Sequence, residues 1–389
     1  MTQRRTTLGE PIAPTQPARA VPPDDPAAVV DLAAIEGNLG VVRGLLAPGT
    51  RVLAAVKADA YGHGLVPVAR RLEAAGVEWF GVATPTEALT LREAGVGGGV
   101  LLLGPVRDPG TITRLADAGV SITLTDERAL ELVAQADLPR TLQVQIGVDT
   151  GMGRLGLPPS GLAQLAAAVL KRRKLELGGV WTHFADSDSD DRSFTLTQLE
   201  RFREGLAALE AAGITPPLVH AANSAAIAAY PEAHLDMVRA GIVLYGHHAS
   251  PTIERLYPPL RPAMRFEAPV TFVKRVAAGT PLSYGGLWRA PRDTTIATLR
   301  VGYADGYPRQ LTGHGWVSLR GRSCQVAGRV CMDQLMIDVG DLQDVTPGER
   351  AVLWGPDGPD AESLARAFGT VSYELLTGVG ARVPRVYVG

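Results

Sequence analysis

The sequence predicts an α/β protein with two parts, a (β/α)8 TIM-type barrel followed by a mostly antiparallel β C-terminal domain. Up to about residue 255, short apolar runs rich in β-formers alternate with helical stretches, which is typical of a parallel sheet covered by helices. Beyond residue 255 the runs are short and turns are frequent, which is typical of an antiparallel sheet. A length of 389 residues accommodates both parts.

Nine runs are candidate strands, although a barrel of this type needs only eight over about 250 residues. We expect the first run to be the extra one and to pair outside the barrel. The candidates are residues 28–31, 52–58, 79–84, 100–104, 121–125, 142–150, 177–184, 218–223 and 238–246.

The domain boundary is predicted at residue 255, because the segment LYPPLRP that follows carries three prolines and is typical of a linker. The barrel then covers residues 27–255 and the β domain residues 256–389. Residues 1–26 hold six prolines and almost no apolar run, so we expect a disordered tail. Arg4 and Arg5 are not followed by a hydrophobic segment, so we do not interpret them as part of an export signal.

The composition excludes several classes of protein. A net charge of −2 favours neither nucleic acid nor an acidic membrane surface as a partner. No window of 18 uninterrupted apolar residues predicts a transmembrane helix. The only cysteines, Cys324 and Cys331, form no disulfide framework, so we expect a protein of the reducing cytoplasm.

The stretch RVLAAVKADAYGHG, residues 51–64, is the most informative part of the chain. An apolar run ends at Lys57 and is followed by residues typical of a loop. Most lysines are solvated, so a surface lysine at a strand end is one interpretation. The other is a Schiff-base lysine, whose lowered pKa lets the free amine attack an aldehyde.

Other polar residues also follow the predicted strands. Each has an ordinary structural interpretation, such as a hydrogen-bonded histidine or a surface arginine. In a barrel, however, the carboxyl ends of the strands meet at one rim, where the active site lies, so their convergence favours a functional site. These residues are Lys57, Arg154, His183, His220, Asn223, Ser224 and Arg239.

From about residue 28 to Gly389 the sequence resembles the alanine racemases. The motifs that carry the resemblance are VKADAYGHG, DTGMGRLG, THFA, AANSAA, RAGIVLYG, LSYGG, VGYADGYPR, GRVCMDQ and RVPRVY. The resemblance implies a barrel that binds pyridoxal 5'-phosphate (PLP), no metal ion, and a homodimer whose active sites are shared between subunits. It also implies interconversion of L- and D-alanine by two bases, which supplies D-alanine for cell-wall peptidoglycan.

The resemblance also implies a role for individual residues. Lys57 would be the Schiff-base lysine and one catalytic base, and Tyr284, supplied by the partner subunit, the opposing base. Arg154 and the backbone amide of Met332 would hold the substrate carboxylate, with Tyr303 and Asp333 at the entrance. The cofactor-binding residues would be Lys57, Tyr61, His183, Asn223, Ser224, Arg239, Gly241 and Ile242, with His220 behind Arg239.

The residue at the cofactor's ring nitrogen affects the chemistry. Many PLP enzymes place an acid there, which keeps the ring protonated and strongly electron-withdrawing. An arginine does not release its proton at working pH, so Arg239 favours an unprotonated ring nitrogen. The negative charge of the substrate carbanion is then less delocalised into the ring. This disfavours protonation at the wrong carbon and so suppresses transamination.

Two positions depart from the family pattern. Gly147 stands where many members carry a carbamylated lysine, so a water, a bound anion or a neighbouring side chain must replace that lysine. Ala381 stands where the family pattern has a tyrosine just before RVPR, which predicts a wider entrance unless another side chain fills the gap.

Other functions remain open at this stage. A racemase of broader specificity, or one for serine, would share the fold. A PLP-dependent decarboxylase or aldolase usually lacks an arginine at the ring nitrogen. A non-enzymatic PLP-binding protein is also compatible with a barrel, although the β domain that bears Tyr284 argues against it.

Overall fold

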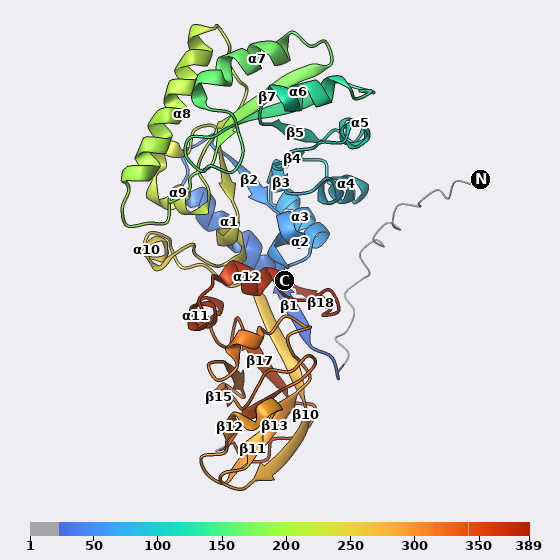
Figure 1. Ribbon diagram of the computed structural model, residues 1–389, viewed down its shortest axis with the longest axis vertical. Helices are drawn as coiled ribbons and strands as arrows, with labels where there is room; N and C mark the ends of the chain where they lie inside the picture. Colours follow the sequence, from blue (N-terminus) through green and yellow to red (C-terminus); the bar gives the residue numbers. More distant parts are fainter. Residues whose placement is uncertain (1–22, 341) are drawn as a thin grey trace, which may run out of the picture.

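The computed structural model describes residues 23–340 and 342–389, so most of the predicted tail lies outside the described residues. The chain forms two bodies joined end to end, with the barrel at one end and the β domain at the other (Figure 1). The C-terminus lies between the two bodies, beside α12 (Ser372–Thr377), which places the last segment of the chain close to the barrel (Figure 1).

The barrel has the eight predicted parallel strands, in the order β8-β7-β6-β5-β4-β3-β2-β9. The ring closes between β8 and β9, where Asp236 N–H donates to Val219 O over 3.1 Å and Arg239 N–H to Ala222 O over 2.8 Å. The strands are β2 (Arg51–Ala55), β3 (Trp79–Val82), β4 (Gly99–Leu102), β5 (Ser121–Leu124), β6 (Leu142–Val148), β7 (Leu175–Thr182), β8 (Val219–His220) and β9 (Met237–Ala240).

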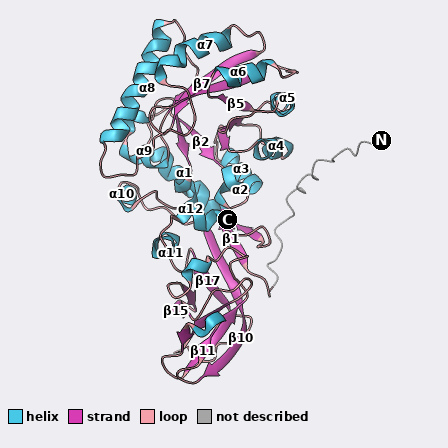
Figure 2. Cartoon of the chain, viewed as in Figure 1, coloured by secondary structure: helices cyan, strands magenta, loops and turns pink. Residues whose placement is uncertain are grey.

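Helices cover the outside of the barrel (Figure 2). Several begin at a side-chain cap, as at α4, where Thr84 and Glu87 form a reciprocal capping box. All of these helices except α1, which precedes β2, follow a barrel strand and turn the chain back for the next parallel strand. They are α1 (Leu32–Gly44), α3 (Leu65–Ala74), α4 (Pro85–Glu93), α5 (Pro109–Asp117), α6 (Glu127–Ala134), α7 (Leu162–Leu170), α8 (Ser193–Ala211) and α9 (Ser224–Ala229).

The second body is built on an eight-stranded sheet with the order β13-β16-β15-β14-β17-β10-β1-β18, and β13 also pairs with β10. All of its pairs are antiparallel except β1 with β18. Its strands are β1 (Ala27–Asp31), β10 (Met264–Val276), β13 (Thr294–Leu299), β14 (Trp316–Leu319), β15 (Arg322–Val326), β16 (Leu335–Asp338), β17 (Arg350–Trp354) and β18 (Arg385–Val388).

The second body also contains a short hairpin and short helices. Strands β11 (Pro281–Leu282) and β12 (Trp288–Arg289) form a separate hairpin. The two predicted helical segments near the end of the chain are α11 (Ala361–Ala367) and α12, and α10 (Pro251–Glu254) lies before the linker. None of the helices in the described ranges is long and apolar enough to span a membrane.

The first strand of the described chain pairs outside the barrel, as the sequence predicts, and it does so next to the edge strand of the second sheet. Strand β1 lies between β10 and β18. The first and the last strands of the described chain are therefore held side by side. Gly62 of the barrel also packs against this end, because a Cβ there would lie 2.1 Å from Leu376 O of α12.

Several strands are shorter than the sequence predicts, including β2 and β9 at the ends that carry candidate site residues. Lys57 does not continue β2, which ends at Ala55, and begins the short turn α2 (Lys57–Tyr61). Strand β9 ends at Ala240, and the apolar run after it forms the 3-10 helix η3 (Ile242–Tyr245). An apolar run of this length does not distinguish a strand from a buried helical turn, and here the backbone turns at Gly241, with φ −120° and ψ −105°.

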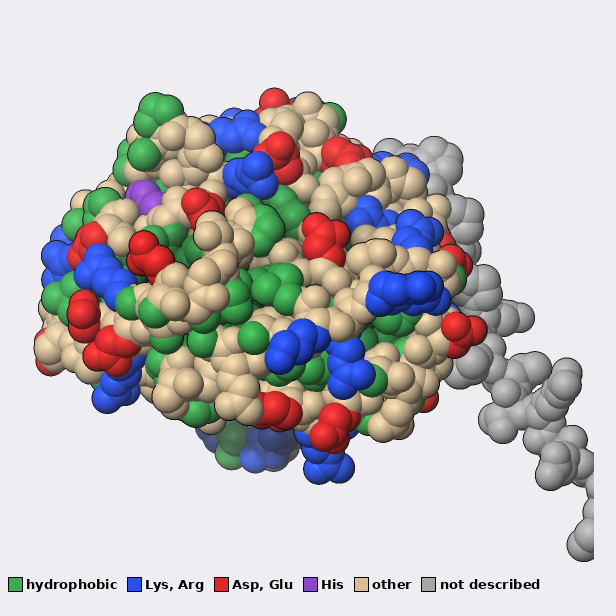
Figure 3. Space-filling model, turned by 90° about the horizontal axis from the view of Figure 1, so that it is seen from above, with side chains coloured by type: hydrophobic (Ala, Val, Ile, Leu, Met, Phe, Trp, Pro, Cys, Tyr) green, Lys and Arg blue, Asp and Glu red, His purple; other side chains and the backbone are tan. Residues whose placement is uncertain are grey.

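Seen from the barrel end, acidic and basic side chains are interspersed over the surface (Figure 3). This mixed distribution matches the net charge of −2 and gives that face no extended field of one sign.

Candidate active site

The predicted barrel residues gather at one cavity of about 480 Å³. They come from the carboxyl ends of several strands, where active sites of this fold lie. Nine of them line the cavity, namely Lys57, Tyr61, Arg154, His183, Asn223, Ser224, Arg239, Gly241 and Ile242.

The backbone after Lys57 has an unusual conformation. Four consecutive non-glycine residues, Ala58 to Tyr61, have φ between 52° and 54°, which is the left-handed region. Each such residue costs roughly 1–2 kcal/mol relative to the right-handed form. The turn places Lys57 and Tyr61 at the same cavity, so the surrounding contacts must offset this cost.

Three side chains hold the left-handed turn. Glu87 accepts the N–H of Ala58 at 2.6 Å, and Asp59 accepts the N–H of Leu65 at 2.7 Å. The buried ring of His63 contacts Tyr61 O at 2.9 Å and Ala60 O at 3.1 Å through Nδ1. Because both partners are carbonyl acceptors, Nδ1 carries the proton and donates.

The cavity favours the neutral amine of Lys57. Burial lowers the pKa of Lys57, the charges of Arg154 and Arg239 lower it further, and Glu87 acts in the opposite direction. A larger fraction of the amine is therefore unprotonated than for a solvated lysine, which is the form that attacks an aldehyde or accepts a proton.

Arg239 is buried, with 5% of its surface exposed, and no carboxylate of the described residues is among its hydrogen-bond partners. Its Nη2 donates to Thr182 O at 2.6 Å and Ala221 O at 2.8 Å, and its Nη1 to His220 O at 3.2 Å. Burial lowers the pKa of Arg239 to about 9, which still leaves a cation at neutral pH.

Two histidines complete the environment of Arg239. His220 Nδ1 lies 3.0 Å from Nη1 of the guanidinium, and His183 Nδ1 lies 3.1 Å from Nη2. Each Nδ1 is therefore an acceptor, and His220 Nε2 donates to Gln145 Oε1 at 2.8 Å. Burial, followed by the charge of Arg239, lowers the pKa of both rings, so both are neutral.

The other end of the cavity fits a phosphate group. An added Cβ at Gly241 would lie 2.6 Å from the Tyr61 hydroxyl and 3.5 Å from Ser224 Oγ, so only glycine leaves this space open. Ile242 begins η3, where the first N–H groups of a helix have no intrahelical acceptor and suit an anion. Burial raises the pKa of Tyr61 to about 12, which keeps its hydroxyl a hydrogen-bond donor.

Asn223 supports the phosphate end from the first turn of α9. Its Oδ1 accepts the N–H of Ala226 at 3.0 Å and the hydroxyl of Ser187 at 2.9 Å. These contacts cap α9 and fix Ser224, whose Oγ accepts the N–H of Gly241 at 2.8 Å. The residues present therefore fit PLP, with an amine near one end, a phosphate cup, and a cation without an acidic partner.

The space beside Gly147 is occupied by uncharged side chains. An added Cβ at Gly147 would meet the Thr123 methyl carbon at 3.3 Å and carbons of Leu155 and Trp181 at 3.6 Å. Uncharged side chains therefore lie directly against this position. Arg154 is exposed and remains the positive charge at this wall of the cavity.

The predicted residues of the β domain lie apart from the cavity. Tyr284 is 71% exposed, Met332 53% and Tyr303 41%, and Asp333 is exposed as well. None of the four lines the cavity that contains Lys57. The chain therefore gathers the predicted cofactor-binding residues at one cavity without the second predicted base.

Ala381 does not line the Lys57 cavity, and the structure reveals there a tyrosine that sequence reasoning missed. Ala381 lines an adjacent cavity of about 1000 Å³, which shares Ala58 and Thr377 with the Lys57 cavity. Tyr373 of α12 lines the Lys57 cavity, and its ring centroid lies 6.0 Å from that of Tyr61. The available signal was an aromatic residue in VSYELLTGVG, which a helical pattern alone assigns to packing.

Comparisons with known proteins agree with this geometry. The model of the alanine racemase N-terminal domain matches residues 30–249, and that of the alanine racemase C-terminal domain matches residues 263–387. The alanine racemase of Desulforamulus reducens is 42% identical over 367 residues, covering 93% of this chain and 98% of its own length. That of Carboxydothermus hydrogenoformans is 44% identical over 367 residues, covering 93% and 99%.

Solved structures give the same result. The alanine racemase of a D-cycloserine-producing Streptomyces lavendulae has a TM-score of 0.87 and 38% identity, covering 95% of this chain and 98% of its own. The alanine racemase of Streptomyces coelicolor A3(2) has a TM-score of 0.86 and 39% identity, covering 94% and 98%.

The electrostatics of Lys57 give a prediction. Arg154→Gln removes a positive charge that lowers the pKa of Lys57, so the pKa of this amine should rise. In cofactor-free protein, the rate at which an aldehyde reagent modifies Lys57 rises with pH as the amine loses its proton. The midpoint of this pH dependence should lie at a higher pH in Arg154→Gln than in the wild type. Peptide mass spectrometry measures modification at Lys57 alone.

The matched control is Arg203→Gln, which removes an exposed arginine paired with Glu200 in α8. It should leave the midpoint unchanged. A midpoint that stays in place, or moves to lower pH, in Arg154→Gln would contradict this account of the amine.

Proposed function

Because this chain belongs to the alanine racemase family, as both domain matches and its relatives show, we propose that it interconverts L- and D-alanine with PLP as its cofactor. The observation that carries the proposal is one cavity lined by the amine of Lys57, the phosphate cup around Gly241 and the buried cation Arg239. The D-alanine produced would serve cell-wall peptidoglycan.

The chain's own groups would hold the cofactor at three points. Lys57 would bind it covalently, the hydroxyls of Tyr61 and Ser224 with the amides of Gly241 and Ile242 would hold its phosphate, and Arg239 would face its ring nitrogen. When bound, the cofactor makes the α-proton of the amino acid acidic by accepting electron density into its ring system. Arg239 retains its protons, so it would keep the ring nitrogen unprotonated and would limit the reaction to racemisation.

Racemisation requires that a proton leave one face of the α-carbon and that another return to the opposite face. The unprotonated amine of Lys57 suits one of these steps, because its pKa is lowered. We assign the other step to the phenol of Tyr284. This side chain is 71% exposed in the protomer, so we propose a homodimer in which each subunit supplies Tyr284 to its partner.

The substrate would be held near both bases. Arg154, which lines the cavity, would bind its carboxylate together with the backbone amide of Met332 from the partner chain, with Tyr303 and Asp333 at the entrance. His183 would pack against the cofactor ring, and His220 would keep Arg239 in place from behind.

Alanine is favoured over larger substrates because a side chain limits the cavity. Tyr373 lies in the cavity wall near Tyr61, where it fills space that the sequence assigned to position 381. A racemase with broader or serine specificity and a PLP carrier without turnover are the alternatives. The proposed compartment is the cytoplasm, which the presence of only two cysteines, both free, supports.

The function is tested by incubating the protein with PLP and single L-amino acids and measuring the D-products by chiral chromatography. D-alanine should form with wild-type protein and not with Lys57→Ala. Borohydride should fix the cofactor on Lys57, as peptide mapping can establish. A reduced adduct on a different lysine would refute the assignment, and an adduct on Lys57 without any D-product would favour the carrier.

The proposed homodimer gives a second prediction. Lys57→Ala and Tyr284→Phe chains should each be inactive alone, because every site in either homodimer lacks one base. A mixed dimer contains one site with both bases, so mixing the variants should restore part of the activity. The absence of recovery, when native mass spectrometry shows that mixed dimers have formed, would rule out a shared site.

The cavity wall gives a third prediction. Tyr373→Ala should raise kcat/KM for serine relative to alanine by about tenfold, because a pocket rejects a larger substrate through its bulk. Tyr373→Phe keeps the ring, and Ala381→Tyr changes a residue outside this cavity, so both should keep the wild-type ratio. A raised preference for alanine in Ala381→Tyr would instead place position 381 at the entrance.

A further inference from the structure

Two loops of the β domain lie directly against each other. Residues 302–305 and 331–334, which we call the entrance loops, carry Tyr303 and Met332. Their backbones are joined where Tyr303 N–H donates to Cys331 O and Ala304 N–H to Met332 O, each over 3.0 Å. Gly302 permits this approach, because a Cβ there would lie 2.2 Å from Cys331 O.

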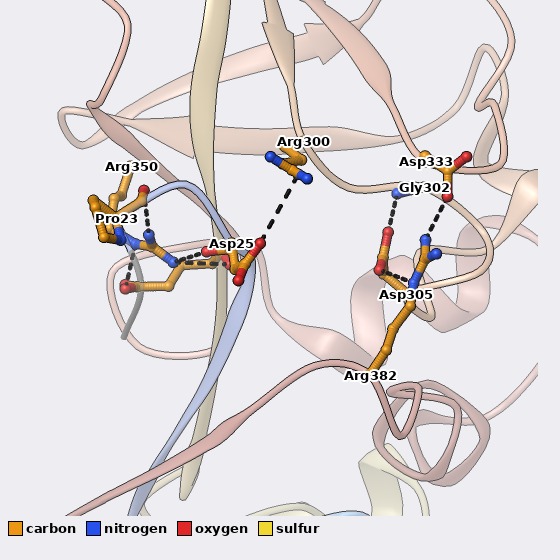
Figure 4. Close-up of polar contacts among 9 residues, drawn as sticks. Pro23, Asp25, Arg300, Gly302, Asp305, Asp333, Arg350 and Arg382 are labelled. Atoms are coloured by element: carbon orange, nitrogen blue, oxygen red, sulfur yellow. Dashed lines mark hydrogen bonds and ion pairs between the residues drawn. The ribbon is translucent and has the colours of Figure 1, made fainter. Parts of the chain in front are cut away.

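The side chain of Arg382, which lies outside both entrance loops, bridges them. Arg382 follows α12 and extends toward both loops (Figure 4). Its Nε donates to Asp305 Oδ1 at 2.6 Å, and its Nη2 donates to Asp333 Oδ1 at 2.7 Å. The planar guanidinium therefore fixes the spacing between one carboxylate on each loop.

Asp305 depends on this contact more than Asp333 does. Only 4% of Asp305 is exposed, and its second oxygen, Oδ2, accepts Gly302 N–H at 2.8 Å. A buried carboxylate is costly without a cation nearby. Its backbone is also tied to the segment before Arg382, because Gly380 N–H donates to Asp305 O over 2.9 Å.

The neighbouring arginines are directed elsewhere. Arg300 Nε lies 3.9 Å from Asp25 Oδ1, and Arg350 donates through Nη2 to Asp25 O at 3.0 Å (Figure 4). Their contacts anchor the start of the described chain. Arg382 is thus the arginine whose contacts join the entrance loops.

We propose that Arg382 is a positioning residue that sets the spacing of the entrance loops, so that Met332 and Tyr303 reach the partner subunit's active site in the correct arrangement. The inference rests on the proposed function and on the shared site. Arg382 itself touches neither substrate nor cofactor, and it acts through Asp305 and Asp333.

The first test compares kinetic constants in the holoenzyme. Arg382→Gln should lower kcat/KM for alanine by about tenfold to a hundredfold, because small displacements of substrate-holding groups have effects of this size. The loss should lie mainly in KM, since the Met332 amide would hold the substrate carboxylate. The cofactor's absorbance and the dimer mass should not change.

A conservative variant separates positioning from folding stability. Arg382→Lys keeps a charge beside buried Asp305, but an ammonium group lacks the planar fork that reaches both carboxylates. Arg382→Gln should lower the Tm, because it leaves the buried Asp305 carboxylate without this cation. Arg382→Lys should restore the wild-type Tm, but its KM should stay as high as that of Arg382→Gln. A wild-type KM in Arg382→Lys would overturn the claim that the bridge between the two loops is what positions them.

The matched control is Arg320→Gln. Arg320 forms two 2.6 Å contacts with Glu349 in the same domain, and its partners lie outside the entrance loops. It should keep the wild-type KM. Hydrogen exchange gives a readout independent of activity, because peptides that contain residues 302–305 should exchange faster in Arg382→Gln and not in Arg320→Gln.

Mixed dimers with two affinity tags test whether Arg382 acts on the partner's site. In a dimer of Lys57→Ala with Arg382→Gln, the one site with a lysine receives its entrance loops from the chain with intact Arg382, so KM should be that of the wild type. In a dimer of wild type with the double variant Lys57→Ala/Arg382→Gln, the one active site receives altered loops, so KM should be high.

The reversed pattern, or equal KM values in the two mixed dimers, would overturn the inference. An active wild type with an unchanged kcat/KM in Arg382→Gln would overturn it too, while leaving the proposed function intact. An inactive wild type would overturn the proposed function and this inference with it.

Discussion

The chemistry of this site depends on a buried arginine with no carboxylate among its hydrogen-bond partners. Arg239 donates to three backbone carbonyls and to two imidazoles, so its charge is solvated by dipoles and is not neutralised. Burial lowers the pKa of Lys57 and of both neighbouring histidines, and the charge of Arg239 lowers it further. The arrangement gives an amine of lowered pKa and neutral imidazole rings around a cation, in a cavity suited to a phosphate and a carboxylate.

The backbone gives the second constraint. A strand that ends at Ala55 is followed by four left-handed residues, an arrangement that costs free energy and persists because Glu87, Asp59 and His63 hold it. The barrel rim brings this turn beside Gly241 and Arg239. The C-terminal segment closes the same region, where Tyr373 lines the cavity and Arg382 links the entrance loops.

Much of the architecture could be predicted from the sequence, because the alternation of strands and helices and the change in pattern after residue 255 are strong signals. The residues of the Lys57 cavity could also be predicted, since they follow successive strands and parallel strands end at one rim. The extra strand was identified by counting, but its place between β10 and β18 depends on long-range pairing that no local pattern encodes.

The parts that could not be predicted involve the direction of a side chain or the conformation of a short apolar run. Position 381 lies next to a motif, yet its side chain lines a different cavity, whereas Tyr373 from the preceding helix takes the place near Tyr61. The surroundings of Gly147 depend on Leu155 and Trp181, which meet it only in the folded barrel. The bridge made by Arg382 joins residues 77 and 49 positions away in the chain, so no spacing in the sequence reveals it.

The central claim is that two bases on opposite faces of the substrate, one from each chain, carry out racemisation. It is tested most directly by exchange of the α-proton with deuterated solvent in the Tyr284→Phe variant, measured separately for L- and D-alanine. The account predicts that exchange from L-alanine slows far more than exchange from D-alanine, because Lys57 still serves the D-isomer. Equal slowing of the two exchange reactions would contradict it and would indicate one base that serves both faces.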